Sequence, residues 1–319
     1  MNRALRTHLA AVTAVLMAAG CQGESGTVDD AGPTEGVVSA GGLDRPYVVK
    51  GKGTPLLAIA SAHYGSRLFT GPILDHFRIY CVDSRLFLPS DSGFDVETIT
   101  IESVAQELDE IRQAFGFETV AVLGHSIFGN FALEYARRYP DRVTHVVVVG
   151  APPIGFMQGF LAAQDEYWES HASDERKAIL ERNYAELSED SLSKLAPEEA
   201  WRAVQAANVP QWWYDPTFDS APLWEGTPLQ NREVRERLFG LLYEYDLGQG
   251  PGQIETPVFV AEGVYDYVVP HTLWYDELPK LLNATFHLFE KSGHSPQFEE
   301  PELFAEKLIE WFEKTGSGR

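Results

Sequence analysis

Cysteine is nearly absent from this sequence, which removes one common way of stabilising a fold. Only Cys21 and Cys81 occur among 319 residues, so a disulfide-rich framework is excluded. Cys81 lies in the apolar run 78–82, where its simplest role is that of a small buried apolar residue. A disulfide between Cys21 and Cys81 is the alternative, and it predicts that the denatured, unreduced protein has no free thiol.

Basic residues are also scarce, because 25 Lys and Arg stand against 47 Asp and Glu and give a formal charge of -22. Such a negative surface repels phosphate backbones, so we expect no nucleic-acid partner. The histidines show no metal-ligand spacing, so we predict no metal and no cofactor. With 44% hydrophobic and 12% aromatic residues, the chain is nevertheless typical of a globular protein.

The first twenty residues have the layout of a secretory signal peptide. Arg3 and Arg6 precede the apolar stretch 9–19, which is too short for a comfortable membrane-spanning helix. Residues 1–20 hold these two arginines and no acid, so their removal changes the formal charge from -22 to -24. The small residues before Cys21 resemble a bacterial lipoprotein processing site. This resemblance implies a lipid anchor at Cys21 and an exported protein held at a membrane of the cell envelope.

Residues 21–45 are rich in glycine and acids and have few large apolar side chains, which predicts a flexible tether. Apolar runs that are typical of strands then alternate with amphipathic helical patterns over 46–150 and again over 256–319. This alternation predicts an α/β fold with a mostly parallel sheet and helices on both of its faces. A helical segment is expected near 273–282.

The alternation of strand and helix patterns stops over 151–255, where the sequence has helical patterns and no β-rich run. We expect a helical cap inserted after the sixth strand, over the carboxyl ends of the strands. It holds five of the seven tryptophans, and most of these should hold the cap together. The aromatic stretch 211–215 could also line a substrate pocket, which makes Trp212, Trp213 and Tyr214 candidate substrate-binding residues.

Chemistry is most clearly indicated at the turn 122–130. An apolar strand-like run ends there and a helical pattern begins at Ile127, so Ser126 lies where the chain reverses sharply. A serine in such a turn presents its hydroxyl and is a candidate nucleophile. The alternative is an ordinary connection between a strand and a helix that happens to contain a serine.

A serine nucleophile needs a base and an acid that orients the base, and both should follow strand ends. Asp266 follows the penultimate predicted strand and His294 follows the last one, whereas Asp276 is a weaker candidate for the acid. The order Ser126, Asp266, His294 at these points resembles the α/β-hydrolase superfamily. The resemblance covers about 46–312 and implies an α/β-hydrolase fold with a Ser-His-Asp triad.

The resemblance also implies the mechanism. His294 would deprotonate Ser126, which would attack a carbonyl and form an acyl-enzyme that water then hydrolyses. The oxyanion would be held by the backbone N–H of Ile127 and by that of His63, with Ala62 as the alternative.

In sequence, the motifs most resemble those of the proline-iminopeptidase-like branch of this superfamily, but three segments depart from that pattern. The loop 61–65 lacks the glycine-rich oxyanion motif, 86–89 replaces a glycine-rich loop, and Phe128 stands where a small residue is usual. We expect the ring of Phe128 to point into the pocket and to form part of an acyl-binding wall.

The expected function is therefore hydrolysis of an ester or amide bond in a small molecule or short peptide. Proline-iminopeptidase activity and hydrolysis of a carbon-carbon bond next to a carbonyl are alternatives within the same mechanism. A surface-anchored binding protein that has lost catalysis is an alternative of another class. The oligomeric state cannot be inferred from the sequence.

Overall fold

The computed structural model describes residues 34–89, 91–156 and 159–316. The predicted signal peptide, Cys21 and the first part of the predicted tether lie outside these residues. Within the described residues, no helix has both the length and the apolar character that a membrane span requires.

An eight-stranded sheet forms the centre of the fold, in the order β1-β2-β4-β3-β5-β6-β7-β8. The first two strands pair antiparallel, as do β2 and β4, and every other neighbouring pair is parallel. This confirms the mostly parallel α/β sheet. The strands are β1 Thr34–Ala40, β2 Leu43–Lys50, β3 Thr54–Ala60, β4 Phe77–Asp83, β5 Val120–His125, β6 Val143–Val149, β7 Val258–Gly263 and β8 Ala284–Phe289.

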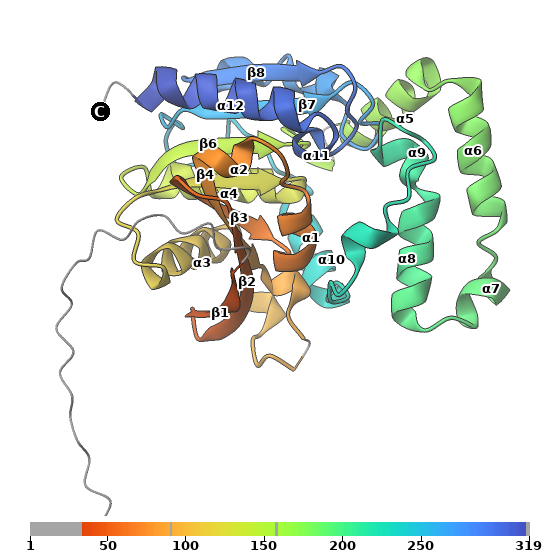
Figure 1. Cartoon of the computed structure of the whole chain (residues 1–319), viewed down its shortest axis with the longest axis horizontal. Coiled ribbons are helices and arrows are strands. Elements are labelled where there is room, and N and C mark those ends of the chain that lie inside the picture. Colours follow the sequence, from red (N-terminus) through yellow and green to blue (C-terminus); the bar gives the residue numbers. More distant parts are fainter. Residues whose placement is uncertain (1–33, 90, 157–158, 317–319) are drawn as a thin grey trace, which may run out of the picture. The chain divides into compact units, whose positions relative to one another are not determined.

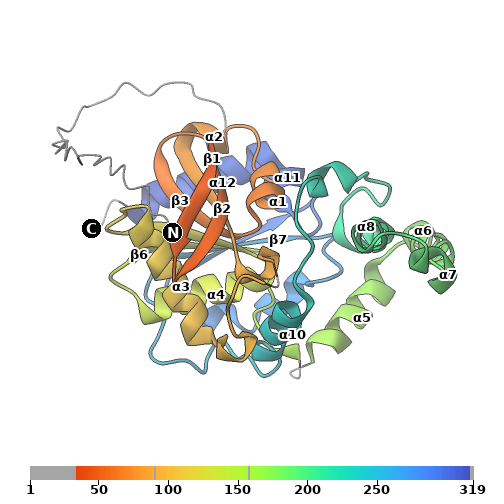
Figure 2. The same cartoon turned by 90° about the horizontal axis from the view of Figure 1, so that it is seen from below.

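Helices cover both faces of this sheet, as Figure 2 shows. On one face, α3 (Ile101–Ala114) and α4 (Ile127–Arg138) bury their apolar sides in one large core cluster. On the other face, α2 (Ile73–His76) and α12 (Pro301–Gly316) pack in a second cluster. The strands β5 and β6 have side chains in both clusters, which explains why their sequences are almost continuously apolar. Two short helices, α1 (Ala62–Arg67) and α11 (Pro296–Glu299), follow the ends of β3 and β8.

The segment between β6 and β7 is helical, as the sequence predicts for the cap. The helices α5 to α9 lie together at the right of Figures 1 and 2, and α10 lies nearer to the sheet. Their bounds are α5 Phe160–His171, α6 Asp174–Ala185, α7 Glu189–Ser193, α8 Pro197–Ala207, α9 Val209–Trp212 and α10 Arg232–Leu241.

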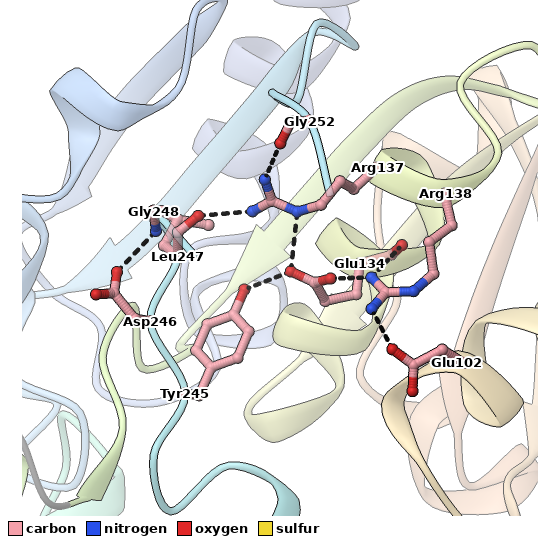
Figure 3. Close-up of polar contacts among 9 residues, drawn as sticks. All are labelled: Glu102, Glu134, Arg137, Arg138, Tyr245, Asp246, Leu247, Gly248 and Gly252. Carbon is pink, nitrogen blue, oxygen red and sulfur yellow. Dashed lines mark hydrogen bonds and ion pairs between the residues drawn. The ribbon is translucent and has the colours of Figure 1, made fainter. Parts of the chain in front are cut away.

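A buried ion-pair network joins the end of this helical segment to α4 (Figure 3). Arg137 is 8% exposed and donates to the carbonyls of Leu247 and Gly252, each at 2.6 Å. Glu134 accepts hydrogen bonds from Arg137 at 3.1 Å and from Tyr245 at 3.3 Å. The helix that begins beside Ser126 therefore anchors, at its other end, the chain that returns from the cap.

Two local predictions are wrong. The tether cannot extend to residue 45, because 34–45 hold β1 and the first three residues of β2, and the two strands pair around the turn at Gly41 and Gly42. Both glycines have positive φ, and two such residues suit a tight hairpin turn. The segment 273–282 forms the short 3₁₀ turns His271–Trp274 and Leu278–Lys280 instead of an α-helix. Pro279 lacks the N–H that a continuous helix would need there.

Candidate active site

Ser126 stands at the turn between β5 and α4, as predicted, and its backbone is strained. With φ of 57° and ψ of -137° it is the one non-glycine residue with positive φ in the described part of the chain. Such a conformation costs on the order of 1–3 kcal/mol and persists only where its surroundings enforce it. The Ser126 N–H donates to the carbonyl of Val149 at 2.9 Å, which ties the turn to the end of β6.

Two glycines make room for this turn. A Cβ on Gly124 would lie 2.1 Å from the carbonyl oxygen of Phe128, and one on Gly129 would lie 2.4 Å from the Cβ of Ala151. The close approach of α4 to β6 therefore depends on Gly129. In the family pattern the small residue stands at the position that Phe128 occupies here, and Gly129 follows one place later. Phe128 is 6% exposed, packs near Phe131 in the core cluster, and also lines the cavity beside Ser126.

His294 and Asp266 meet at the carboxyl edge of the sheet, on the loops after β8 and β7. The distance between His294 Nδ1 and Asp266 Oδ2 is 2.6 Å, and both side chains are almost fully buried. The second oxygen of Asp266 accepts the N–H groups of Val268 at 2.9 Å and Val269 at 2.8 Å. Since these two backbone donors fix the carboxylate, the carboxylate fixes the imidazole in turn. Asp276, the weaker candidate, is exposed.

The other ring nitrogen of His294, Nε2, is buried and has no hydrogen-bond partner among the described residues. His294 lines the same cavity as Ser126, so this nitrogen is available for a proton transfer there. The backbone N–H of His294 donates to the backbone carbonyl of Trp212 at 2.6 Å. The Trp212 ring lies edge-on to the imidazole, with 5.0 Å between the ring centroids. The histidine loop and the cap are thus in direct contact.

Glu299, which was not predicted to belong to the site, also joins the histidine loop to the cap. One oxygen of its carboxylate accepts the N–H of Gly293 at 2.9 Å and that of Ser295 at 3.2 Å, on either side of His294. The other accepts the N–H of Tyr214 at 2.7 Å. Burial raises the pKa of Glu299 to about 7, against the opposing effect of these hydrogen bonds. An acid five residues after a predicted base gave no signal, because its partners lie far apart in the sequence.

A cavity of about 250 Å³ opens beside Ser126 and His294. Side chains from the core and from the cap line it together, and most of them are apolar or aromatic. The lining residues are Ala60, Tyr64, Leu86, Phe87, His125, Ser126, Ile127, Phe128, Gln205, Trp212, Trp224, Gln230, Arg235, Phe239 and His294.

Of the predicted substrate-binding residues, Phe128 and Trp212 line this cavity, whereas Trp213 and Tyr214 do not. Trp213 is 5% exposed and packs against Phe218 and Phe298 in a separate aromatic cluster. Tyr214 is 41% exposed and lines a different surface groove. After the short helix α9 the chain becomes extended at Trp213, so neighbouring side chains point in different directions.

In the loop predicted to complete an oxyanion site, Ala62 and His63 begin α1. The N–H of Ala62 donates to Asp83 at 2.6 Å, so this donor is already in use. Burial raises the pKa of Asp83 to about 6. Of the residues in this loop, Tyr64 lines the cavity, with its ring stacked on Trp224 at 3.7 Å between centroids.

Two further titratable groups lie close to the predicted triad. Burial and the neighbouring His294 lower the pKa of His125 to about 3, so its ring is neutral at physiological pH, and its Nε2 lies 2.8 Å from the His294 carbonyl. Glu262, at the end of β7, is fully buried, and burial followed by the charge of Asp266 raises its pKa well above the usual value. Neither residue was predicted to belong to the site.

No group of three or more His, Cys, Asp or Glu side chains in the described ranges is arranged to hold a metal ion. Cys81 in β4 is buried and has no disulfide partner among the described residues, and burial raises the pKa of its thiol to about 12. This agrees with the expectation of a small buried apolar residue. The other cysteine lies outside the described residues.

Comparison with known proteins identifies the family. A family model described as the alpha/beta hydrolase fold matches residues 60–301. The chain belongs to the α/β-hydrolase superfamily, and it is a hydrolase. It is 31% identical over 287 residues to the AB hydrolase superfamily protein YclE of Bacillus subtilis (strain 168), with 88% of this chain and 99% of that protein covered.

More distant relatives include proline iminopeptidases. That of Saccharolobus solfataricus is 22% identical over 284 residues, which cover 85% of this chain and 88% of the relative. The crystal structure of the proline iminopeptidase of Mycobacterium smegmatis superposes with a TM-score of 0.63 at 17% identity, covering 88% and 98% of the two chains. At these identities the likeness to the solved structure establishes the α/β-hydrolase fold alone.

Proposed function

We propose that this α/β-hydrolase is a serine hydrolase that cleaves an ester or amide bond of a small substrate through an acyl-enzyme. The observation that carries the proposal is that Ser126 and His294 line one cavity while the buried Asp266 holds His294 from behind. Ser126, on a strained turn, lines it together with His294, whose other ring nitrogen is held by Asp266 at 2.6 Å. A purely structural serine has no need of this backbone strain.

Each group has a defined role. His294 Nε2 takes the proton of Ser126 as the oxygen attacks the carbonyl carbon, and it later gives that proton to the leaving group. Asp266 fixes the tautomer of the imidazole and stabilises the imidazolium that forms. Water then repeats the attack on the acyl-enzyme and regenerates the Ser126 hydroxyl.

The oxyanion is assigned to two backbone donors, the N–H of Ile127 and that of His63. Ile127 opens α4 directly after the nucleophile, so the first donor comes from a helix start. The alternative donor Ala62 is engaged by Asp83, which leaves His63 as the better candidate in that loop, although neither residue is among the described residues that line the cavity. Loss of one such donor typically costs ~10²–10³ in rate.

An aminopeptidase needs carboxylates that bind the ammonium group of its substrate. Four acids of the cap that are candidates for this role are all exposed and lie outside the cavity lining: Glu166, Glu169, Glu225 and Glu244. The cavity has no Asp or Glu among its described lining residues. These facts favour esters over proline peptides.

Turnover of p-nitrophenyl butyrate, compared with prolyl and other aminoacyl arylamides, tests the proposal. We expect ester hydrolysis that follows saturation kinetics and is lost in Ser126→Ala. Hydrolysis that persists in a well-folded Ser126→Ala protein would contradict the assignment. Cleavage of the arylamides alone would favour the iminopeptidase hypothesis over the esterase hypothesis. Activity on neither class of substrate would favour a binding role.

We also propose that the enzyme is exported and anchored by a lipid on Cys21. The basis is the sequence of residues 1–21, in which two arginines precede an apolar stretch that ends in small residues before the cysteine. Mass spectrometry of the N-terminal peptide from membrane-extracted protein tests this. A diacylated Cys21 as the first residue is expected, and an unmodified chain that begins at Met1 would contradict it.

A further inference from the structure

The charge lining the cavity is opposite in sign to that of the protein. The whole chain has a formal charge of -22, yet among the described residues around the cavity there is no Asp or Glu and one cationic side chain of fixed charge, Arg235. The remaining lining is mostly aromatic and aliphatic. An apolar cavity with a single cation at its side favours a ligand with an anionic group.

Arg235 differs from the other two arginines of α10 in having no hydrogen-bond or ion-pair partner among the described residues, although it lies within the electrostatic influence of Glu236. Arg232 pairs with Glu236 at 2.7 Å, and Arg237 donates to the carbonyl of Ile99 at 2.8 Å. No hydrogen bond or ion pair engages the Arg235 side chain within the described ranges, and the side chain is exposed. No described acceptor therefore occupies its guanidinium donors, and the residue itself lines the cavity.

Two uncharged polar side chains of the cap line the same cavity as Arg235. Gln205 on α8 and Gln230 just before α10 also line the cavity, and no described residue forms a hydrogen bond with either side chain. The three unpartnered polar side chains all come from the cap, whereas the nucleophile and base come from the core. A ligand that reaches both walls can be attacked at one end and held by a polar group at the other.

We infer that the substrate is an ester that carries a carboxylate a few bonds from the scissile carbonyl, and that Arg235 binds this carboxylate. The guanidinium matches a planar carboxylate with two parallel hydrogen bonds. The inference rests on the proposed ester hydrolysis and adds the chemical class of the substrate. Arg235 is then a specificity-determining residue and takes no part in bond cleavage.

Pairs of methyl esters test the inference, with acid release followed by pH-stat titration. Monomethyl succinate, glutarate and adipate are each compared with the neutral methyl ester of equal chain length. The O-acetyl derivatives of small hydroxy acids, compared with simple alkyl acetates, place the carboxylate on the alcohol side instead. We expect the wild type to prefer the anionic member of at least one pair, in kcat/KM.

Substitution at Arg235 should reduce that preference. In Arg235→Gln we expect the ratio of anionic to neutral kcat/KM to fall about tenfold, the scale of a charged hydrogen bond at a partly exposed position. Arg235→Lys should restore part of the ratio, because it keeps the charge and loses the planar fork. Arg232→Gln is the matched control: it removes the same charge from the same helix outside the cavity, and its ratio should equal that of the wild type.

The outcomes separate this inference from the proposed function. If esters are hydrolysed but the ratio is equal in the wild type and Arg235→Gln, the carboxylate assignment is wrong and the serine-hydrolase proposal stands. An equal fall in Arg232→Gln would also overturn it, because the effect would then come from net charge. If no ester of either kind is hydrolysed, the proposed function fails first.

Discussion

The cavity beside Ser126 has two walls that differ in how firmly their side chains are held. On the core wall, Ile127, Phe128 and His294 are 7%, 6% and 1% exposed, and the hydrogen bond from the Ser126 N–H to the Val149 carbonyl ties the turn to the end of β6. On the cap wall, Phe239 is 42% exposed and Arg235 has no partner among the described residues. The core wall is buried, whereas the cap wall combines the buried Trp224 with side chains that are open to solvent.

This difference separates the two tasks of the site. The core wall holds the groups that would break the bond, and such groups must keep their geometry within a fraction of an ångström. The cap wall holds polar groups that can select a substrate without being fixed in advance. Changes on the core wall should therefore act on kcat, and changes on the cap wall should act on the choice between substrates.

The largest effect on the core wall is expected from Asp266→Asn. Asparagine keeps the shape but favours the wrong tautomer of His294, so kcat for a good ester should fall by about 10⁴-fold. Asp276→Asn, at an exposed position on the following segment, is the control and should leave kcat unchanged. An active Asp266→Asn enzyme together with an inactive Asp276→Asn enzyme would reverse the assignment of the acid.

The next effect concerns the attachment of the cap to the core. Arg137→Ala removes the donor to the carbonyls of Leu247 and Gly252 and leaves them buried (Figure 3). We expect a loss of about 3 kcal/mol in stability, seen as a melting temperature lower by several degrees. The exposed Arg232→Ala is the control. A melting temperature of Arg137→Ala equal to that of the control would show that the network does not hold the cap.

A smaller effect is expected where the two walls meet. Glu299→Gln replaces one accepting oxygen by an NH₂ group that faces backbone N–H donors around His294 or Tyr214. We expect kcat to fall by about tenfold, with a shift in the acidic limb of the pH profile, because the group whose pKa is raised to about 7 is gone. Glu302→Gln, at an exposed position, should have the wild-type profile. A change in melting temperature alone would mean that Glu299 is only structural.

The smallest effect is expected for Glu262→Gln. Burial raises the pKa of Glu262 in the folded state, so the wild type gains stability from the neutral acid at low pH and loses it as pH rises above the unfolded value. Glutamine mimics the neutral acid. The two proteins should therefore differ by less than about 1 kcal/mol near pH 5, and the variant should be the more stable one at pH 8. Thermal melts at both pH values check this, and a variant that is less stable at pH 8 contradicts it.

The two walls also differ in how well their residues could be predicted from the sequence. The turn at Ser126 and the loops with Asp266 and His294 were predicted because parallel strands end at one edge of the sheet. Knowing the order of the strands was enough to expect these three residues together, and the structure does place His294 against Asp266. The alternation of apolar strand-like runs with amphipathic helical patterns predicted the α/β fold class.

On the cap wall, sequence patterns gave much less. Arg235, Gln205 and Trp224 reach the cavity only because several helices pack together, and no local pattern indicates which face of α10 or α8 that will be. Trp213 and Tyr214 were expected there and lie elsewhere. The hairpin of β1 and β2 was missed because its few buried residues, such as Val38 and Ala40, lie in a segment dominated by glycine and acids.

The most direct test of the central claim is the mass of the folded protein after reaction with a fluorophosphonate. We expect one covalent adduct per chain, located on the peptide that contains Ser126, and none in Ser126→Ala. Ester hydrolysis should stop as the adduct forms. An adduct on another residue, or a folded and hydrolytically active protein that remains unlabelled, would contradict the assignment of Ser126 as the nucleophile.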